Sequence, residues 1–299
     1  MKKVIIIGAN SFIARNFIQN LLNNYSNEAK LELFDYQLIQ VDGFANYHQL
    51  NILKKENALK LPLDCDLLYL FSGKTGTLDG FSNYSEFIDI NEKGLLNILN
   101  ACKEKGFKGK IIFPSSRLVY KGSEKDLSED DSKELKTIYA VNKFACEQYL
   151  KIYKDMFGIN YCIFRICVPY GSIIEANPSY GTVGFMLKQA KEKRCISIYG
   201  DGSVKRTFTH MFDLCSILWL AGSDNRCVND VYNIGGETRS LLEVAKIISK
   251  KYDSGITFTP YSDNQFSIET GSTTFSFRKL NKIIKYHYKY SLDGWAIEQ

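Results

Sequence analysis

The sequence predicts an α/β protein with a doubly wound parallel sheet and a smaller mixed α/β domain on its carboxyl-terminal side. In the first half, short apolar runs alternate with amphipathic stretches, which is typical of strands and helices in βαβ order. A glycine turn joins the first apolar run to the first amphipathic stretch. The run "YCIFRICV", residues 161–168, is almost entirely apolar, which indicates a strand buried on both faces of the sheet.

The elements of the first half follow one another in a regular order. Strands are expected at residues 4–7, 31–34, 47–52, 67–71, 111–113 and 161–168, because each is a short run rich in apolar residues. Helices are expected at residues 12–24, 87–105 and 133–157. The last of these should end at Gly158, since glycine is the residue that most often follows a helix.

The second half begins with a change of composition after Pro169. The stretch "YGSIIEANPSYGTVG" is rich in Gly, Pro and Ser, which predicts long loops at the carboxyl end of the sheet, where ligands bind in such folds. Beyond these loops, helices are expected at residues 185–192, 212–221 and 241–252, and a further sheet strand at "VYNIGG", residues 231–236.

Composition limits the classes of partner. The chain has 299 residues, of which 45% are apolar and 24% charged, as in ordinary globular proteins. Its net charge of +5 comes from scattered lysines, which argues against a nucleic-acid partner and fits an anionic small substrate. His48, His210 and His287 lie far apart, so no metal site is expected.

Cysteine usage and hydropathy predict a cytoplasmic protein. The eight cysteines form no C-x-x-C pair and mostly lie in apolar runs, where a reduced thiol behaves as a small apolar side chain. The first apolar run stops at Ile7, too short for a signal peptide. No stretch approaches the ~20 apolar residues of a membrane-spanning helix, so no membrane association is expected.

The glycine turn "IIIGANSFIA" predicts a dinucleotide site. Gly8 directly follows a strand and opens a helix, where backbone N–H groups can meet a pyrophosphate. Ser11 and Ala14 stand where two further glycines are usual, so a plain strand-to-helix turn remains the alternative. Asp35 ends the second strand, where a carboxylate would bind ribose hydroxyls and repel a 2′-phosphate. NAD(H) is therefore favoured, while nearby lysines leave NADP(H) open, and a solvated loop acid is the alternative for Asp35.

Short motifs recur in a fixed order along nearly the whole chain. They are "GANSFIA" from Gly8, "LNIL" from Leu50, "NEKGLLNILNAC" from Asn91, "FPSSRLVY" from Phe113, "YAVNK" from Tyr139, "FRICVPYG" from Phe164, "IYGDGSVKRTF" from Ile198 and "VYNIGG" from Val231. Together they resemble the extended short-chain dehydrogenase/reductase family, in its nucleotide-sugar epimerase, dehydratase and 4-ketoreductase group. The resemblance implies a Rossmann-type sheet, with residues 1–170 and 207–235 in the dinucleotide-binding domain and residues 171–206 and 236–299 in a nucleotide-sugar-binding domain.

The same resemblance implies a catalytic trio. Tyr139 would be the general acid/base, Lys143 would bind the nicotinamide ribose and lower the pKa of the tyrosine, and Ser116 would hydrogen-bond the sugar oxygen. The spacing of Tyr139 and Lys143 is uninformative by itself, since composition gives about two such pairs by chance. The magnitudes agree with the roles: a free tyrosine titrates near ~10, and a lysine charge ~4 Å away contributes roughly 4 kcal/mol, about three pKa units.

The resemblance also implies two sets of binding residues. The expected cofactor-binding residues are Gly8, Asn10, Ser11, Phe12, Ile13, Asp35, Asn51, Ile52, Phe71, Ser72, Gly73, Tyr139, Lys143, Ile166 and Pro169. The expected substrate-binding residues are Lys74, Ser115, Ser116, Arg117, Val168, Tyr180 and Arg206. Among these, Arg206 matches the arginine that binds the nucleotide diphosphate, for which a fork-shaped donor is suited.

Two departures from the family pattern affect the expected reaction. Arg117 and Leu118 replace the Asp-Glu pair of the sugar 4,6-dehydratases, which argues against dehydration. Val168 stands where C4-epimerases typically have an Asn that reaches the diphosphate, and the chain is somewhat shorter than most such epimerases. These departures favour a 4-ketoreductase that reduces an NDP-4-keto-6-deoxyhexose, for example a dTDP sugar, in bacterial surface-polysaccharide (O-antigen) pathways.

Alternatives stay open at this stage. An NAD-dependent C4-epimerase is favoured by Asp35, because an epimerase holds NAD permanently whereas many reductases draw on NADPH. A non-catalytic dinucleotide-binding protein is the remote alternative, since a fold does not dictate chemistry. The helices at 87–105 and 133–157 suggest, by the resemblance, a homodimer formed through a four-helix bundle.

Overall fold

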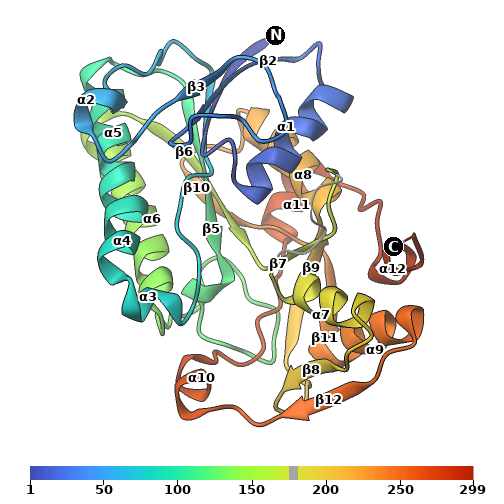
Figure 1. Cartoon of the computed structure of the whole chain (residues 1–299). Coiled ribbons are helices and arrows are strands. Elements are labelled where there is room, and N and C mark those ends of the chain that lie inside the picture. Colours follow the sequence, from blue (N-terminus) through green and yellow to red (C-terminus); the bar gives the residue numbers. More distant parts are fainter. Residues whose placement is uncertain (175–180, 299) are drawn as a thin grey trace.

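A seven-stranded parallel sheet forms the centre of the larger part of the molecule (Figure 1). The computed structural model describes residues 1–174 and 181–298. The strand order is β10-β6-β5-β4-β1-β2-β3. The strands span Lys2–Ile7 (β1), Ala29–Asp35 (β2), Tyr47–Gln49 (β3), Leu67–Leu70 (β4), Lys110–Ser116 (β5), Asn160–Ile166 (β6) and Asp230–Asn233 (β10). This arrangement confirms the expected doubly wound α/β fold.

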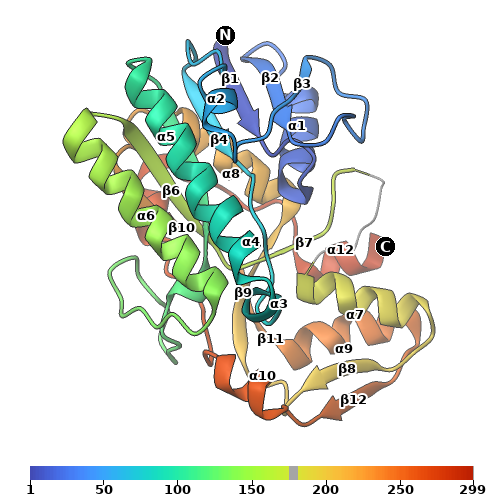
Figure 2. The same cartoon turned by 60° about the vertical axis from the view of Figure 1, so that its left-hand side comes forward.

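Helices cover both faces of this sheet, because successive strand side chains point to opposite sides. On β1, Val4 and Ile6 enter a core with helices α1, α8 and α11, while Ile5 and Ile7 enter a core with α2, α5 and α6. These helices span Phe12–Asn24 (α1), Met211–Ser223 (α8), Arg278–Ile284 (α11), Lys55–Ala58 (α2), Gly94–Glu104 (α5) and Ile138–Phe157 (α6). Figure 2 shows α5 and α6 side by side on one flank.

The smaller part of the molecule has its own sheets and core. A three-stranded sheet has the order β11-β9-β7, and β12 pairs in parallel with β8. These strands span Val168–Tyr170 (β7), Ile196–Tyr199 (β8), Lys205–His210 (β9), Glu237–Ser240 (β11) and Ile256–Thr259 (β12). A third core gathers residues of α7 (Gly181–Lys191), α9 (Leu241–Tyr252) and α12 (Leu292–Glu298) around them. The exact division into domains remains a prediction, although β10 and α8 pack with the large sheet.

The apolar run expected as one strand at 161–168 is divided between two sheets. β6 ends at Ile166 beside β5, whereas Val168 begins β7 and pairs with Phe208 of β9. Ile166 belongs to a core of the large sheet, while Cys167 and Val168 belong to the core of the smaller part. The run is apolar because each portion is buried in a different core, so its hydrophobicity could not reveal the boundary.

The long helix expected at 133–157 begins later than predicted. The Thr137 hydroxyl accepts a hydrogen bond from the Ala140 backbone N–H at 3.1 Å, which fixes the start of α6 at Ile138. Lys133 instead forms an isolated antiparallel bridge with Tyr120. At the other end, Gly158 adopts the left-handed conformation with φ of 72°, as expected for the residue after a helix.

The helix expected at 87–105 is observed as a continuous helical run with an irregular centre. It consists of α4 (Tyr84–Ile88), a π-helical turn at Asp89–Lys93 and α5. Such turns insert one residue into a helix and are frequent at functional sites. Short helices α3 (Asp79–Ser82) and α10 (Asp263–Ile268) and a 3₁₀ turn at Arg117–Val119 complete the described elements.

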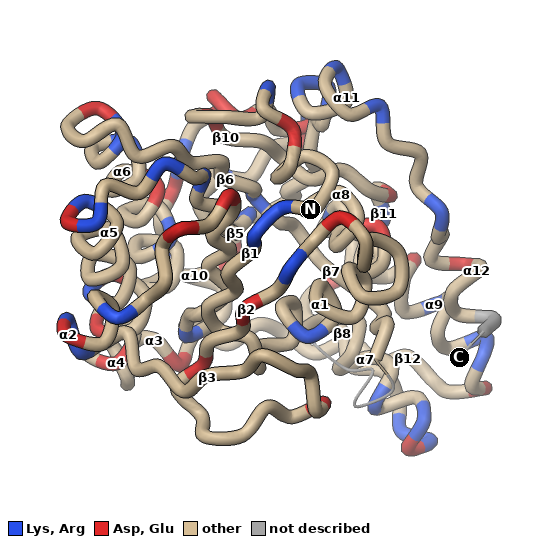
Figure 3. The backbone as a smooth tube through the Cα atoms, turned by 90° about the horizontal axis from the view of Figure 1, so that it is seen from above, with Lys and Arg blue, Asp and Glu red and all other residues tan. Residues whose placement is uncertain are grey.

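The charged residues are mixed along the chain. Figure 3 shows Lys and Arg interspersed with Asp and Glu over most elements, so the net charge of +5 has no single source. Within the described residues, no helix is long and apolar enough to cross a membrane, and no group of His, Cys, Asp and Glu is arranged to hold a metal ion. All eight cysteines are free thiols.

Candidate active site

The glycine turn is built for close approach of its backbone to a ligand. Gly8 has a φ of +84°, and a Cβ at this position would lie 2.3 Å from the Ser72 backbone nitrogen. The Gly8 N–H donates to Phe34 O at 2.8 Å, which holds the turn against the end of β2. Both the left-handed conformation and the contact with Ser72 therefore require glycine. The following helix, α1, points its amino end toward the cavity described next.

A cavity of about 440 Å³ lies at the carboxyl ends of β1, β2 and β4. It gathers most of the residues expected to bind the cofactor, together with Lys74: Gly8, Asn10, Ser11, Asp35, Asn51, Ile52, Phe71, Ser72 and Gly73. The other six expected residues do not line it: Phe12 and Ile13 begin α1, Tyr139 and Lys143 lie in α6, and Ile166 and Pro169 lie near the junction of β6 and β7. The volume of the cavity and its lining by Gly8, Ser11 and Asp35 fit a dinucleotide.

Asp35 is buried in the wall of this cavity, with 5% of its surface exposed. Its carboxylate accepts hydrogen bonds from the backbone N–H groups of Asn10, at 3.0 Å, and Gln37, at 3.2 Å. The alternative of a solvated loop acid is therefore wrong. Because the carboxylate is fixed beside the glycine turn, it is placed to accept from a ribose diol and to repel a 2′-phosphate.

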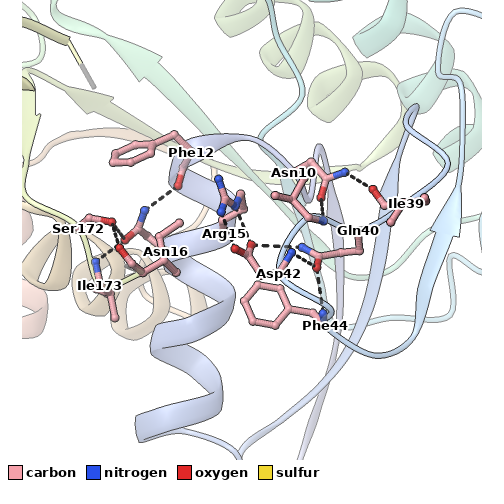
Figure 4. A network of polar contacts seen from close by, with 12 residues as sticks. Asn10, Phe12, Arg15, Asn16, Ile39, Gln40, Asp42, Phe44, Ser172 and Ile173 are labelled. Atoms are coloured by element: carbon pink, nitrogen blue, oxygen red, sulfur yellow. Dashed lines mark hydrogen bonds and ion pairs between the residues drawn. The ribbon is translucent and has the colours of Figure 1, made fainter. Parts of the chain in front are cut away.

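The loop after β2 is fastened to the glycine turn by a network of polar contacts (Figure 4). The Asn10 side chain donates to Ile39 O at 2.9 Å and accepts from the Val41 N–H at 3.1 Å. Arg15 forms two contacts with the Asp42 carboxylate, at 2.6 and 2.5 Å. The Asn10 side chain is thus hydrogen-bonded within the protein. The Arg15 charge close to the turn is neutralised by Asp42, so it is not available to bind a phosphate.

Ser116 ends β5, and the Tyr139–Lys143 pair lies in the first turns of α6, which packs against β5. The Lys143 ammonium donates to Pro114 O at 2.8 Å and lies 5.9 Å from the centre of the Tyr139 ring. Ser116, the last residue of β5, accepts from the Leu118 N–H at 3.2 Å. Only 8% of the Lys143 surface is exposed, and this burial lowers the pKa of its ammonium to about 8. The sequence-predicted trio thus lies at one corner of the sheet.

Because Lys143 is buried, we expect its replacement to lower activity and to raise the free energy of unfolding. Lowering its pKa from 10.5 to about 8 corresponds to a penalty of about 3 kcal/mol for the charged form, partly offset by the bond to Pro114 O. We expect Lys143→Met to lose activity yet to raise the free energy of unfolding at pH 7 by about 1–3 kcal/mol. Urea unfolding at several pH values measures this.

The sign of the pH effect follows from proton binding. Between pH 8 and 10.5 the unfolded chain holds the Lys143 proton and the folded chain does not, so the stability of the wild type rises with pH. The advantage of Lys143→Met should therefore shrink across this window. An advantage that grows with pH, or a variant less stable than the wild type at pH 7, would contradict the assignment.

A buried polar network joins the end of β5 to α6 and β6. The Ser115 hydroxyl donates to the Glu147 carboxylate at 2.6 Å, and Arg165 binds both oxygens of Glu147 at 2.6 and 2.9 Å. Arg165 also donates to the Tyr120 hydroxyl at 2.7 Å. Glu147 is 0% exposed and Arg165 2%. Ser115, expected to bind substrate, is thus committed to this network, which joins β5, β6 and α6.

Asn91 connects the cofactor cavity with the catalytic helix, a role absent from the predicted site. It lies in the π-helical turn, and its side chain accepts from the Lys74 N–H at 2.8 Å and donates to Asn142 Oδ1 at 3.3 Å. Lys74 lines the cavity, and Asn142 precedes Lys143. The motif "NEKGLLNILNAC" begins at Asn91, and the resemblance identified its helix. The two contacts of the Asn91 side chain are seen only in the structure. The Lys74 ammonium itself pairs with Glu86 at 2.7 Å.

The remaining substrate-side residues gather next to Ser116. Arg206 is 3% exposed and pairs with Glu269 at 2.8 Å. Arg117 donates to the Thr273 hydroxyl at 3.3 Å, and burial and the neighbouring Arg206 lower its pKa to about 10. Val168 is buried in β7. Tyr180 lies outside the described residues.

Solved structures share this architecture over nearly the whole chain. A UDP-glucuronic acid 4-epimerase from Bacillus cereus, in complex with UDP-glucuronic acid and NAD, superimposes with a TM-score of 0.86 at 23% identity, covering 99% of this chain and 96% of that one. The dTDP-glucose 4,6-dehydratase DesIV from Streptomyces venezuelae gives 0.85 at 18% identity, with 98% and 94% covered. These similarities confirm the fold.

Curated relatives are similar at comparable identity. YtcB of Bacillus subtilis, described as an uncharacterized UDP-glucose epimerase, is 24% identical and covers 99% of this chain and 96% of its own. A UDP-N-acetyl-alpha-D-glucosaminuronate decarboxylase of Bacillus cytotoxicus is 26% identical, with 83% and 79% covered. A UDP-glucose 4-epimerase of Mycoplasma pneumoniae is 24% identical, with 73% and 71% covered.

A family model decides the assignment. The model described as the NAD dependent epimerase/dehydratase family matches residues 4–235 of this chain. The match includes the glycine turn, the Ser116, Tyr139 and Lys143 motifs and the strand at 230–233, and it confirms the expected extended short-chain dehydrogenase/reductase resemblance and an NAD(H) cofactor. The chain therefore belongs to the NAD-dependent epimerase/dehydratase family.

Proposed function

We propose that the protein is an NAD-dependent epimerase that inverts C4 of a UDP-linked sugar. The observation that carries this proposal is the NAD-selective ribose site: Asp35 is buried and held by two backbone N–H groups, and Asp42 neutralises Arg15 beside the turn. A site that rejects a 2′-phosphate suits retained NAD better than NADPH drawn from solution. The names of YtcB and of the Bacillus cereus 4-epimerase support the same reading.

The side chains fit the acid/base half of such a reaction. Tyr139 is placed to take the proton of a C4 hydroxyl and later return it, and the Lys143 charge favours the phenolate form that takes it. Ser116 is placed at the end of β5 to hydrogen-bond the C4 oxygen in both its hydroxyl and keto states. The cavity lined by Gly8, Ser11 and Asp35 would hold NAD, which would supply the reversible exchange of hydride with C4.

Dehydration is not supported by the same site. Arg117 and Leu118 occupy the two positions after Ser116 where the dehydratase pattern requires an acid pair. Neither side chain can act as a carboxylic acid or carboxylate, so elimination of water has no proton donor or acceptor at this point.

A 4-ketoreductase remains the second candidate, favoured by one observation. Val168 is a buried strand residue of β7 where epimerases typically have an amide that reaches the diphosphate. Reduction of an NDP-4-keto-6-deoxyhexose would use the same Tyr139, Lys143 and Ser116 in one direction only. This reading was the first expectation from the sequence, and the relatives support the epimerase better.

The experiment that separates the two begins with the purified protein as isolated. After denaturation, the supernatant is assayed for nicotinamide, and the native protein is incubated without added cofactor with UDP-glucose, UDP-N-acetylglucosamine and UDP-glucuronate. The epimerase reading predicts bound NAD and a C4 epimer detected by NMR. A cofactor-free protein that oxidises added reduced nicotinamide stoichiometrically with a 4-keto-6-deoxy sugar would establish the reductase instead.

We further propose the homodimer expected from the resemblance. Apolar side chains are exposed on the flank formed by α4 and α6, which supports an interface there: Tyr84, Ile88, Val141, Ile152 and Met156. Exposed apolar residues gathered on neighbouring helices are typical of association surfaces. Light scattering should give twice the chain mass of 34.2 kDa, and a monomer at micromolar concentration would refute the proposal.

A further inference from the structure

Arg117 is a sheltered cation whose charge is not paired by the described protein. Six of the eight arginines form ion pairs with carboxylates, and Arg278 is exposed to solvent. Arg117 differs from both groups, because it is half-buried and its one described hydrogen bond is to the Thr273 hydroxyl at 3.3 Å. Within residues 1–174 and 181–298, no carboxylate lies within 4.0 Å of its guanidinium. Burying an arginine in this way is costly unless an anion completes the site.

The neighbouring groups increase the need for an anion. Arg206 lies close enough to Arg117 to lower its pKa, and the carboxylate of Glu269 is already bound to Arg206 at 2.8 Å and to the Gly271 N–H at 2.9 Å. Glu269 therefore pairs with Arg206, and Arg117 has no ion-paired carboxylate among the described residues. The cluster has an excess positive charge directly beside the catalytic serine, and the oxygen atoms of a bound ligand would balance it.

The chain position of Arg117 indicates which part of a substrate it meets. It immediately follows Ser116, whose hydroxyl is assigned to the C4 oxygen, so the Arg117 backbone starts beside the reacting end of the sugar. On a pyranose ring, the carbon next to C4 that carries an exocyclic carbon atom is C5, and in a uronic acid this carbon atom belongs to a carboxylate. The diphosphate is attached at C1, across the ring, on the side assigned to Arg206.

We propose that the sugar of the substrate carries a carboxylate at C5, a nucleotide-linked uronic acid, and that Arg117 binds it. This inference rests on the proposed C4 chemistry for the placement of Ser116. A planar guanidinium can donate two parallel hydrogen bonds to a carboxylate, and such charge-assisted bonds are stronger than those to a neutral CH₂OH group. The Thr273 hydroxyl, already bonded to Arg117, holds the guanidinium in place.

The test compares an acidic and a neutral sugar with the same nucleotide. UDP-glucuronate and UDP-glucose are titrated calorimetrically into the Tyr139→Phe protein with its bound cofactor, so that turnover does not interfere. We expect UDP-glucuronate to bind at least about ten-fold more tightly. The Arg117→Met change, added to Tyr139→Phe, should remove this preference while changing the affinity for UDP-glucose less than about three-fold, and Arg117→Lys should restore part of it.

Two other results for the Arg117→Met variant would overturn the proposal, and each would assign Arg117 a different role. If Arg117→Met weakens both ligands equally, the guanidinium binds the diphosphate, and if it changes neither, Arg117 is structural. The matched control is Arg206→Met, which should weaken both ligands equally. Thermal melting verifies that each variant is folded. Because binding is measured without turnover, a carboxylate preference can be established even if the reaction is not epimerisation, so the two proposals fail separately.

Discussion

Replacing Tyr139 by Phe should lower kcat by about 10²–10⁴-fold, the usual contribution of a positioned general acid/base. Tyr139 is the second residue of α6 and lies beside the buried Lys143 ammonium, which favours its phenolate form. The ring remains in the variant, so the fold and the bound cofactor should persist. Steady-state turnover and the nicotinamide content of the purified variant are the two measurements.

A second tyrosine on the same helix provides the control. Tyr153 lies in α6 and packs against Phe157 with ring centres 5.2 Å apart, away from Ser116 and Lys143. We expect Tyr153→Phe to keep kcat within about two-fold of the wild type, since it touches none of the groups that exchange protons. A Tyr139→Phe variant with wild-type turnover would disprove the acid/base assignment, whereas equal losses in both variants would point to helix damage.

Replacing Glu147 by Gln should lower the free energy of unfolding by about 3–5 kcal/mol. The change retains the shape of the side chain but leaves the Arg165 guanidinium, 2% exposed, without its counter-charge. The Gln carbonyl oxygen can still accept from Ser115, but the NH₂ group that replaces the second carboxylate oxygen would face the Arg165 Nη2 donor. Urea unfolding of the wild type and the variant at pH 7 measures the difference.

An exposed ion pair is the matched comparison. Arg194 and Glu192 form a contact of the same type with 57% and 44% of their side chains exposed, so Glu192→Gln should change the stability by less than about 1 kcal/mol. Replacing both Glu147 and Arg165 by Met should cost less than Glu147→Gln alone, because no unpaired charge remains. A Glu147→Gln protein as stable as the wild type would show that the pair carries no buried charge interaction.

The sequence was most informative where function depends on neighbours along the chain. The turn at Gly8 and the apolar run from Val4 to Ile7 are local patterns, so strand, turn and helix could be predicted together. The motifs around Ser116 and Tyr139 identified the catalytic corner by resemblance, and the structure brings these elements together. The binding roles of the individual residues remain predictions.

Long-range pairings could not be predicted in the same way. Nothing local distinguishes the Arg15–Asp42 pair from surface charges, although it neutralises a cation close to the glycine turn. Arg165 did carry a signal, since a charged residue inside an apolar strand needs a buried partner, but its partner Glu147 lies on another element. The point at which the chain leaves the large sheet and enters the smaller one, at Cys167, could not be predicted because the residues on both sides of it are buried in apolar cores.

The 4-ketoreductase expected from the sequence depended on weak evidence. It rested on Val168, a single position where an expected amide is absent, and on chain length. Reductases and epimerases share the same proton-transfer groups and differ in whether the cofactor stays bound. The buried Asp35 and the paired Arg15 bear on that question more directly than the loss of one substrate contact.

If the hydride removed from C4 returns to the same sugar, a deuterium atom at C4 is retained in the product. The protein as isolated is incubated without added nicotinamide with UDP-glucuronate and UDP-glucose, each deuterated at C4, and the products are analysed by NMR and mass spectrometry. We expect a C4 epimer that keeps its deuterium, with bound NAD recovered unchanged. No epimer from either sugar, or an epimer that has lost its deuterium, would contradict the proposed epimerisation.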